Sequence, residues 1–166
     1  MRGSRPRARL ADLGLELPTV APPLAAYVPA VRSVQQVFVS GQLPIVDGEL
    51  LAVGKVGAEV SAEQARELAA RCALNALAAV DALVGLGAVA RVTKVTGFVA
   101  VAPGFTGIPA VVNGASELFG AVFGDAGRHA RSAVGVAELP LGAPVEVEAV
   151  FELGAIWPWR GRRPHR

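Results

Sequence analysis

The sequence has little of the chemistry on which metal and disulfide proteins depend. It contains one cysteine and two histidines in 166 residues, and only 5% of its side chains are aromatic. A lone cysteine, Cys72, excludes an internal disulfide and any metal site built from several cysteines. Two histidines, one of them next to the last residue, argue against a histidine-based metal centre. We therefore expect a protein that needs no metal.

Long hydrophobic runs are missing as well. No apolar run approaches the roughly 18 residues that a membrane span requires. Asp12 and Glu16 fall where a signal peptide would have its apolar core, so no such peptide is expected. Hydrophobic residues nevertheless form 52% of the chain and charged residues 18%, which is typical of a well-filled core and not of disorder. We expect a soluble, cytoplasmic protein with no membrane partner.

Positive charge is concentrated at the two ends of the chain. Half of the 16 Lys and Arg residues lie in residues 1–9 and 158–166. We predict a basic flexible segment at 1–19, a single folded domain at 20–154 and a basic tail at 155–166. Such ends could contact nucleic acid. The region between them has no basic stripe interleaved with aromatics, so no nucleic-acid partner is expected.

Two amphipathic helices are predicted. Ser61 and Gln64 have the spacing of a capping box, and the apolar residues after them recur with a helical period as far as Gly85. Cys72 lies within this apolar stripe and is interpreted as a small core residue. A second helix is expected from about Pro109, which suits a first helical turn. Its apolar face continues to about Phe123.

The remaining apolar segments predict strands. An extended segment at 21–31 precedes a strand at 35–44, and an Asp-Gly turn then leads to a second short strand in a hairpin. Further strands are expected at 90–102 and on either side of the loop at 139–144. The order is β-β-α-β-α-β-β, an α+β fold with a mixed sheet. Two helices cover only one sheet face, so we predict an apolar open face that a homo-oligomer buries.

Charged residues within the last two strands need an explanation. Arg131 precedes one apolar run, while Glu146 and Glu148 are embedded in the next. They could be solvated, or Arg131 could form an ion pair with Glu146 across adjacent antiparallel strands. Alternatively, the guanidinium could bind a small anion as a bidentate fork, with an acid beside it to position water.

Five ordered pieces of sequence carry a resemblance to a known family. They are Tyr27, "VSGQLP" at 39–44, "VVNGASELF" at 111–119, "HARSAVGVAELP" at 129–140 and "VEVEAV" at 145–150. Together they resemble the Rid (YjgF) superfamily, formerly labelled endoribonuclease L-PSP. The resemblance implies a chorismate-mutase-like fold and a homotrimer that encloses a central barrel. It also implies three sites at the subunit interfaces.

The resemblance further implies an activity and a set of residues. Archetypal members hydrolyse 2-imino acids, or their enamine tautomers, to 2-keto acids and ammonia without a cofactor. Arg131 matches the arginine that binds the substrate carboxylate, and Glu146 matches the glutamate that positions water. The other pocket positions that match are Tyr27, Ser40, Gly41 and Asn113.

Two departures from the family pattern indicate a divergent branch. His129 replaces a common proline, and Ala133 stands where archetypal members often carry cysteine. We interpret His129 as a loop residue without a catalytic role. Two alternatives to the deaminase therefore stay open. One is a non-catalytic trimer that binds a small carboxylate-bearing metabolite, and the other is an endoribonuclease that only the Arg-rich ends would support.

Overall fold

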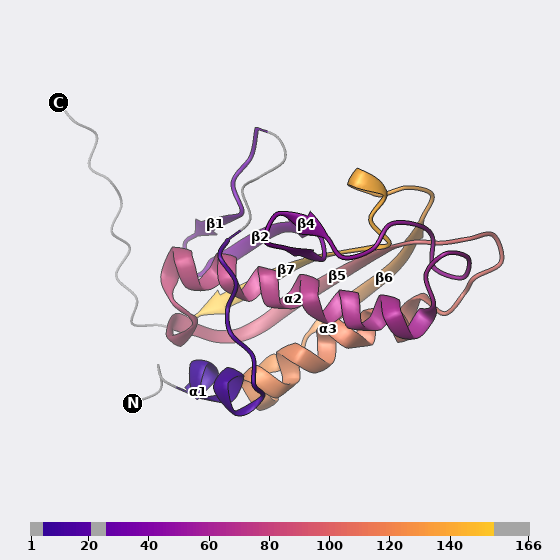
Figure 1. Cartoon of the computed structure of the whole chain (residues 1–166). Helices are drawn as coiled ribbons and strands as arrows, with labels where there is room; N and C mark the ends of the chain where they lie inside the picture. Colours follow the sequence, from indigo (N-terminus) through magenta and orange to yellow (C-terminus); the bar gives the residue numbers. More distant parts are fainter. Residues whose placement is uncertain (1–4, 21–25, 155–166) are drawn as a thin grey trace.

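The computed structural model describes residues 5–20 and 26–154, and the predicted basic tail at 155–166 lies outside the described residues. A five-stranded sheet and two long helices dominate the structure (Figure 1). The helices and strands are α1 (Arg5–Asp12), β1 (Ala30–Ser33), β2 (Gln36–Gln42), β3 (Ile45–Val46), β4 (Glu49–Leu50), α2 (Ala62–Val84), β5 (Val89–Ala100), α3 (Ile108–Phe123), β6 (Ala130–Val136) and β7 (Val145–Leu153). The α+β class predicted from the sequence is confirmed.

The strand order of the main sheet is β1-β2-β7-β5-β6. Only β5 and β6 run parallel, and α3 forms the crossover between them. The main-sheet strands and long helices follow the predicted order β-β-α-β-α-β-β. The first two strands of that order are β1 and β2, however, because the short hairpin strands β3 and β4 form a small sheet of their own. The consequence for the site is that β5 separates β6 from β7.

The β3–β4 hairpin has the turn that its sequence predicts. Asp47 and Gly48 both have positive φ angles, of 51° and 86°. A two-residue turn of this kind requires left-handed backbone at both positions, which glycine and aspartate tolerate better than most residues. The Asp-Gly prediction is confirmed, although each hairpin strand is only two residues long.

Helix α2 begins as the capping box predicts, because the Ser61 side chain accepts a hydrogen bond from the backbone N–H of Gln64 at 3.1 Å. It packs closely against α3. At the crossing a side chain on Gly114 would place its Cβ 1.9 Å from the backbone oxygen of Arg66. The many alanines along α2 serve the same purpose, since small side chains let the helices and the sheet approach each other.

The core lies between these helices and one face of the sheet. Along β7, alternate residues from Val145 to Leu153 are buried, and Phe151 packs edge-to-face on Phe119 of α3 at a ring distance of 5.7 Å. The acids of β7 lie on the opposite, open face. The prediction of an apolar open face is therefore only partly right. The valine face of β7 is satisfied by the helices, and the open face mixes apolar side chains with carboxylates.

The predicted flexible segment at 1–19 is wrong for residues 5–12, which form α1. Leu10 is only 3% exposed and belongs to the core, and Arg9 donates a hydrogen bond to the Val122 carbonyl at the end of α3. Arg7 forms an ion pair with Asp81 of α2. This arginine-rich segment is a short amphipathic helix, which packs against α3 and against the turn Leu86–Ala88 that follows α2. In Figure 1 it lies near the end of α3.

Among residues 5–20 and 26–154, no helix is both long enough and apolar enough to cross a membrane.

Candidate functional site

Arg131 lies on the edge strand β6 and is held by α3. One terminal nitrogen, Nη1, donates to Asn113 Oδ1 at 2.8 Å and to Ser116 Oγ at 3.2 Å. The other, Nη2, donates to the Pro109 carbonyl at 3.3 Å. All three acceptors belong to α3, so the guanidinium has a fixed position at the edge of the sheet.

His129 extends this network behind the arginine. Its Nδ1 lies 2.6 Å from the Gly127 carbonyl and its Nε2 lies 2.9 Å from Ser116 Oγ. A carbonyl can only accept, so Nδ1 carries the proton and, in the neutral ring, Nε2 accepts from the serine hydroxyl. Ser116 is then free to accept from Arg131. His129 lies in the loop before β6, as predicted, and it orients Ser116. That it has no catalytic role stays a prediction.

The hydrogen bonds to α3 leave part of the guanidinium available. An arginine carries five N–H donors, and the three bonds above use three of them. Within the described part of the chain, no carboxylate lies within ion-pair distance of Arg131. Two donors of a fixed fork are what a carboxylate needs for bidentate binding. The arrangement therefore suits a small carboxylate that approaches the outer edge of β6.

Glu146 lies on β7, and its position depends on Gly41 of β2. A Cβ at residue 41 would stand 1.7 Å from Glu146 Oε1, so the carboxylate occupies the space where a side chain would otherwise be. The pairing between β2 and β7 shifts register between Val39 and Gln42, which places Gly41 within a bulge. Bulges often redirect side chains beside functional sites. Here the bulge lets the carboxylate lie against the strand backbone.

The environment of Glu146 favours its protonated form. Burial raises the pKa of the Glu146 carboxyl above its ordinary value, and the nearby negative charge of Glu148 raises it further. Among the described residues, no hydrogen bond or ion pair to the Glu146 carboxylate is present. A half-buried, unpaired acid with a raised pKa is suited to accept and return a proton.

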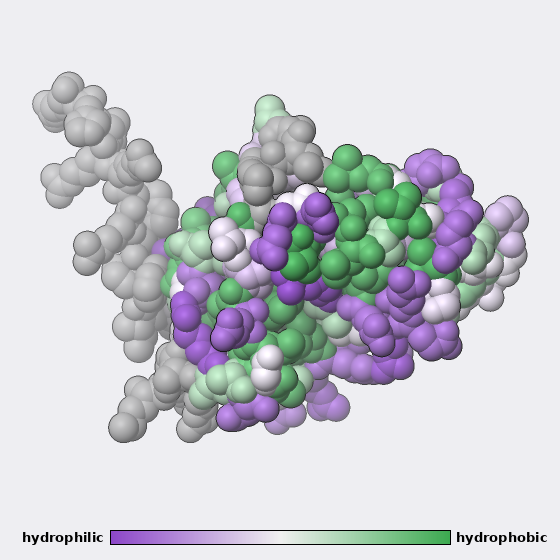
Figure 2. All heavy atoms as spheres, in the orientation of Figure 1, coloured by the Kyte–Doolittle hydropathy of each residue, from purple (hydrophilic) through white to green (hydrophobic). Residues whose placement is uncertain are grey.

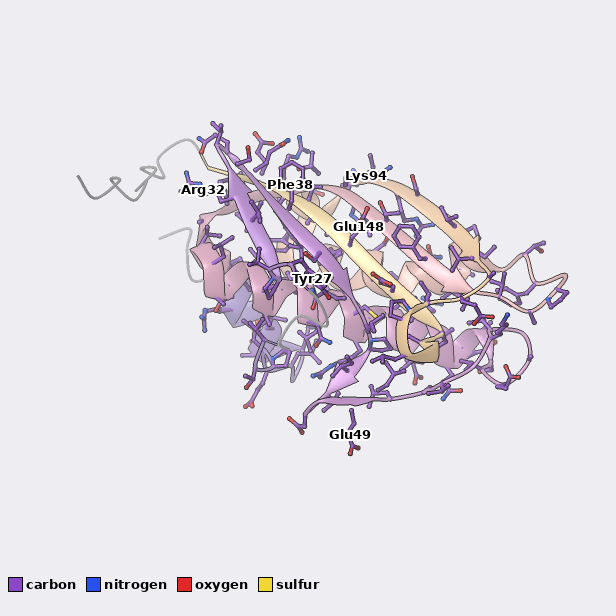
Figure 3. The ribbon with its side chains drawn as sticks, turned by 90° about the horizontal axis from the view of Figure 1, so that it is seen from above. Tyr27, Arg32, Phe38, Glu49, Lys94 and Glu148 are labelled. Carbon is purple, nitrogen blue, oxygen red and sulfur yellow. The ribbon has the colours of Figure 1, made fainter. Side chains whose placement is uncertain are left out.

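Ser40 lies next to Gly41 on β2, and Tyr27 belongs to the segment that precedes β1. Ser40 Oγ donates to the Val28 carbonyl at 2.7 Å, and its backbone N–H donates to the Pro29 carbonyl at 2.9 Å. These bonds attach the segment before β1 to β2. Tyr27, which is 44% exposed, lies beside the second half of β2 in Figure 3.

The two groups of residues do not meet within one chain. Arg131 pairs in register with Val95 and lies on the helix-covered face, whereas Glu146 pairs with Phe98 on the open face. Two strand spacings and three residues separate their Cα positions, about 14 Å in an ideal sheet. The alternative of an Arg131–Glu146 ion pair across adjacent strands is wrong, because β5 lies between β6 and β7.

We refer to Arg131, Asn113 and Ser116 as the arginine half-site, and to Glu146, Gly41, Ser40 and Tyr27 as the glutamate half-site. The sequence comparison with the family identified every member of these sets except Ser116. Ser116 follows Asn113 by three residues and therefore lies on the same helix face. That spacing was a usable signal for its role.

The open face of the sheet carries further polar groups. Figure 3 shows Phe38, Lys94 and Glu148 on the side of the sheet away from α2 and α3. Lys94 Nζ donates to Ser132 Oγ of β6 at 2.8 Å. Glu148 is exposed and pairs in register with Thr96. The open face is therefore partly apolar, and an exposed aromatic residue such as Phe38, which is 45% exposed, is suited to a contact region.

Cys72 takes no part in either half-site. It is fully buried on α2, and burial raises the pKa of its thiol well above the ordinary value. A buried thiol of this kind is inert as a nucleophile. Its predicted place in the core is confirmed. Within residues 5–20 and 26–154, no cluster of three or more His, Cys, Asp or Glu side chains could hold a metal ion.

The chain belongs to the YjgF family: residues 7–153 match the family described as "YjgF/chorismate mutase-like, putative endoribonuclease". It is 46% identical over 151 residues to Protein TCP17 of Trypanosoma cruzi, covering 90% of this chain and 94% of that protein.

Solved structures agree with this assignment. Protein Atu1372 of unknown function from Agrobacterium tumefaciens is 42% identical with a TM-score of 0.83, covering 92% of this chain and 94% of that one. A putative endoribonuclease from Shewanella oneidensis is 33% identical with a TM-score of 0.87, covering 89% and 99%. E. coli TdcF with bound serine is more distant, at 27% identity and a TM-score of 0.53, covering 82% and 93%. The predicted Rid (YjgF) superfamily and its fold are thus confirmed.

Proposed function

We propose that the protein hydrolyses reactive 2-imino acids, or their enamine tautomers, to 2-keto acids and ammonia. The observation that carries the proposal is the separation of two complementary half-sites in one chain. Arg131 is fixed by α3 with two donors unused, and Glu146 is half-buried with a raised pKa and no partner. The arginine half-site contains no acid, and the glutamate half-site contains no cation.

Because the two half-sites lie apart in one chain, a complete site requires a second copy of the chain. A homotrimer in which the edge of β6 of one copy lies against the open face of the next would bring the arginine half-site to the glutamate half-site of a neighbour. Phe38 and the other apolar residues of the open face would be buried in the same contact. Three equivalent sites would then lie at the subunit boundaries, as expected from the family resemblance.

The chemistry follows from these groups. Arg131 binds the planar carboxylate of the substrate as a bidentate fork, which fixes the C=N carbon relative to the neighbouring glutamate. The Glu146 carboxylate accepts a proton from water as the water oxygen attacks that carbon, and it passes this proton to the nitrogen to give a carbinolamine. Glu146 then helps to transfer the hydroxyl proton to nitrogen as the C–N bond breaks. The products are a 2-keto acid and ammonia, and no electrons are exchanged.

The small, polar nature of this site also receives support from a relative. E. coli TdcF was solved with bound serine, a small molecule with a carboxylate beside nitrogen. An imino acid has the same carboxylate and nitrogen on one carbon. We take this as support for the class of ligand.

The test generates imino acids with an amino-acid oxidase and follows keto-acid release. Wild-type protein should accelerate release, and Arg131→Ala and Glu146→Gln should reduce it toward the rate without protein. An Arg66→Gln variant is the matched control, because Arg66 is an exposed arginine whose ion pair with Glu117 includes no residue of either half-site. Equal rates for all samples and for buffer would refute the activity.

Mixing the two inactive variants tests the shared site. If each site takes Arg131 from one copy and Glu146 from the next, mixed trimers of Arg131→Ala and Glu146→Gln contain some sites with both residues intact. Random mixing should restore roughly a quarter of the wild-type activity. No recovery in verified mixed oligomers would show that the two residues do not come from different copies.

A second candidate function uses the same arginine without catalysis. Arg131, held by α3, would bind the carboxylate of a keto acid even if no water attacked the ligand. Ala133, two residues along β6, offers no thiol. Saturable binding of pyruvate that Arg131→Ala abolishes, with no imine turnover, would favour this function. RNA cleavage that persists without residues 1–9 and 158–166 would instead favour a nuclease.

A further inference from the structure

A cavity on the helix side of the molecule is separate from both half-sites. It has a volume of about 340 Å³ and lies between the segment that follows α1, the β3–β4 hairpin and the middle of α2. In Figure 1 that segment crosses α2 on its way from α1 to β1, close to the hairpin. We name it the hairpin cavity, and the residues that define it are Glu16, Leu17, Ile45, Asp47, Arg71 and Asn75.

Arg71 provides the cavity with a cation. Its Nε lies 3.4 Å from the Ile45 carbonyl, a weak bond that nevertheless directs the side chain toward the hairpin. In the described part of the chain, Arg71 forms no ion pair, although Glu16 and Asp47 line the same cavity. A partly buried guanidinium whose terminal nitrogens lack a carboxylate is a binding group for one.

Asn75 gives the cavity a fixed polar floor. It is 6% exposed, and its amide nitrogen donates to the Leu43 carbonyl at 2.9 Å and the Ile45 carbonyl at 3.0 Å. Both amide hydrogens are therefore used, and Oδ1 remains as an acceptor. These bonds attach the hairpin to α2, so the cavity wall is held in place by a buried side chain.

The charge pattern limits the occupant. One arginine stands against two exposed carboxylates, Glu16 and Asp47, so a phosphate with its larger negative charge would be repelled. A zwitterion satisfies both signs, because its carboxylate can bind Arg71 while its ammonium binds the acids and Asn75 Oδ1. The walls contributed by Leu17 and Ile45 are apolar and partly buried. A volume near the lower end of known ligand pockets suits a small molecule.

We propose that the hairpin cavity binds an apolar α-amino acid. The carboxylate lies on Arg71, the ammonium lies toward Asp47 and Glu16, and the side chain packs on Leu17 and Ile45. Figure 2, which views the helix side, shows hydrophilic and hydrophobic surface close together where the hairpin meets α2. The proposal does not rest on the imine hydrolysis, since none of these residues belongs to either half-site.

The experiment titrates the full-length protein with L-leucine by isothermal titration calorimetry. Saturable binding is expected with a dissociation constant of about 1 mM or tighter. Arg71→Gln should weaken binding about tenfold or more, because a charge-assisted pair is lost. 4-Methylpentanoate, which lacks the ammonium, and 3-methylbutylamine, which lacks the carboxylate, should each bind much more weakly than leucine. Inorganic phosphate should not compete.

Control variants locate the binding. Arg66→Gln removes an arginine from the same helix outside the cavity and should leave leucine binding unchanged. The binding that Arg71→Gln weakens should persist in Arg131→Gln. Should Arg71→Gln fail to fold, as judged by circular dichroism, Asp47→Asn serves instead, since asparagine tolerates the left-handed backbone at this turn. It should weaken leucine more than it weakens 4-methylpentanoate.

Two results would overturn the proposal. One is the absence of saturable binding of L-leucine up to about 10 mM, which is weaker than an ordinary metabolite site. The other is binding that Arg131→Gln abolishes and the cavity variants leave intact. That result would place leucine at the arginine half-site. It would refute the cavity proposal without contradicting the proposed imine hydrolysis.

Discussion

The two half-sites are built in opposite ways. The arginine half-site is defined by contacts: Arg131 has three acceptors on α3, and Ser116 is in turn held by His129. The glutamate half-site is defined by a missing side chain, since the Glu146 carboxylate fills the space over Gly41 and has no polar partner in the described structure.

The difference corresponds to two tasks. A group that binds a carboxylate must keep its geometry, and hydrogen bonds from behind provide that. A group that exchanges a proton must have a pKa near the working pH, and hydrogen bonds to its charged form would lower the pKa. Glu146 is instead raised by burial and by Glu148. Fixing one residue and isolating the other is thus consistent with binding by Arg131 and proton transfer by Glu146.

The largest effect is expected from filling the space beneath Glu146. In Gly41→Val the new side chain would displace the flexible end of Glu146, so the fold should survive while kcat for imine hydrolysis falls about a hundredfold. KM should change little, because Arg131 is untouched. Steady-state kinetics measure both. Gly120→Ala on α3 is the control, since nothing lies within 4 Å of its added Cβ. A Gly41→Val enzyme with normal kcat would remove Glu146 from the reaction.

A smaller effect is expected from loosening the arginine. Asn113→Ala removes the shortest of the bonds to the Arg131 guanidinium, at 2.8 Å, and leaves the cation in place. The value of kcat/KM should fall about tenfold, mainly through KM, because a mobile fork binds carboxylate less well. Glu117→Gln, four residues along the same helix and exposed, should change neither constant. A fall confined to kcat would contradict a binding role for Arg131.

The pH profile provides a third comparison. As general base, Glu146 must be deprotonated, so kcat/KM should rise with pH through its raised pKa. Glu148→Gln removes a negative charge that raises this pKa, and the acidic limb should therefore move to lower pH. Glu152→Gln, an exposed acid further along β7, should leave the limb in place. A shift to higher pH in Glu148→Gln would contradict the electrostatic explanation.

Much of the fold could be read from local sequence. The α2 cap at Ser61 and the Asp47–Gly48 turn depend on neighbouring residues alone, and both are present as predicted. Residues 5–12 were predicted to be flexible because the segment is rich in arginine. The helix is held by the burial of Leu10 and by the contacts of Arg9 and Arg7 with the ends of the long helices. The residues of a short segment do not indicate which distant surface it will pack against.

The candidate site shows the same limit. The family motifs identified Arg131 and Glu146 individually, but their relation depends on strand order, which hydrophobic alternation does not encode. Placing β5 between β6 and β7 changes a possible ion pair into two separate half-sites. Similarly, the alternation of apolar and acidic residues along β7 gives the strand two unlike faces, and only the packing of α2 and α3 determines which one is covered.

The smallest expected effect concerns stability and again separates the two residues. Burial raises the folded-state pKa of Glu146 above its unfolded value, so at neutral pH its charge destabilises the fold. That cost is fully present above the folded pKa and disappears as the pH falls below the unfolded pKa. Glu146→Gln should therefore raise Tm at neutral pH by about 2 °C or less, since the group remains partly hydrated. The gain in Tm should vanish at acidic pH, below the unfolded pKa.

Asn113→Ala should instead lower Tm at every pH, because it leaves a part-buried donor of Arg131 without its acceptor. Differential scanning calorimetry from neutral to acidic pH measures both trends, and a Glu146→Gln variant less stable than wild type at neutral pH would show that the carboxylate has a stabilising partner.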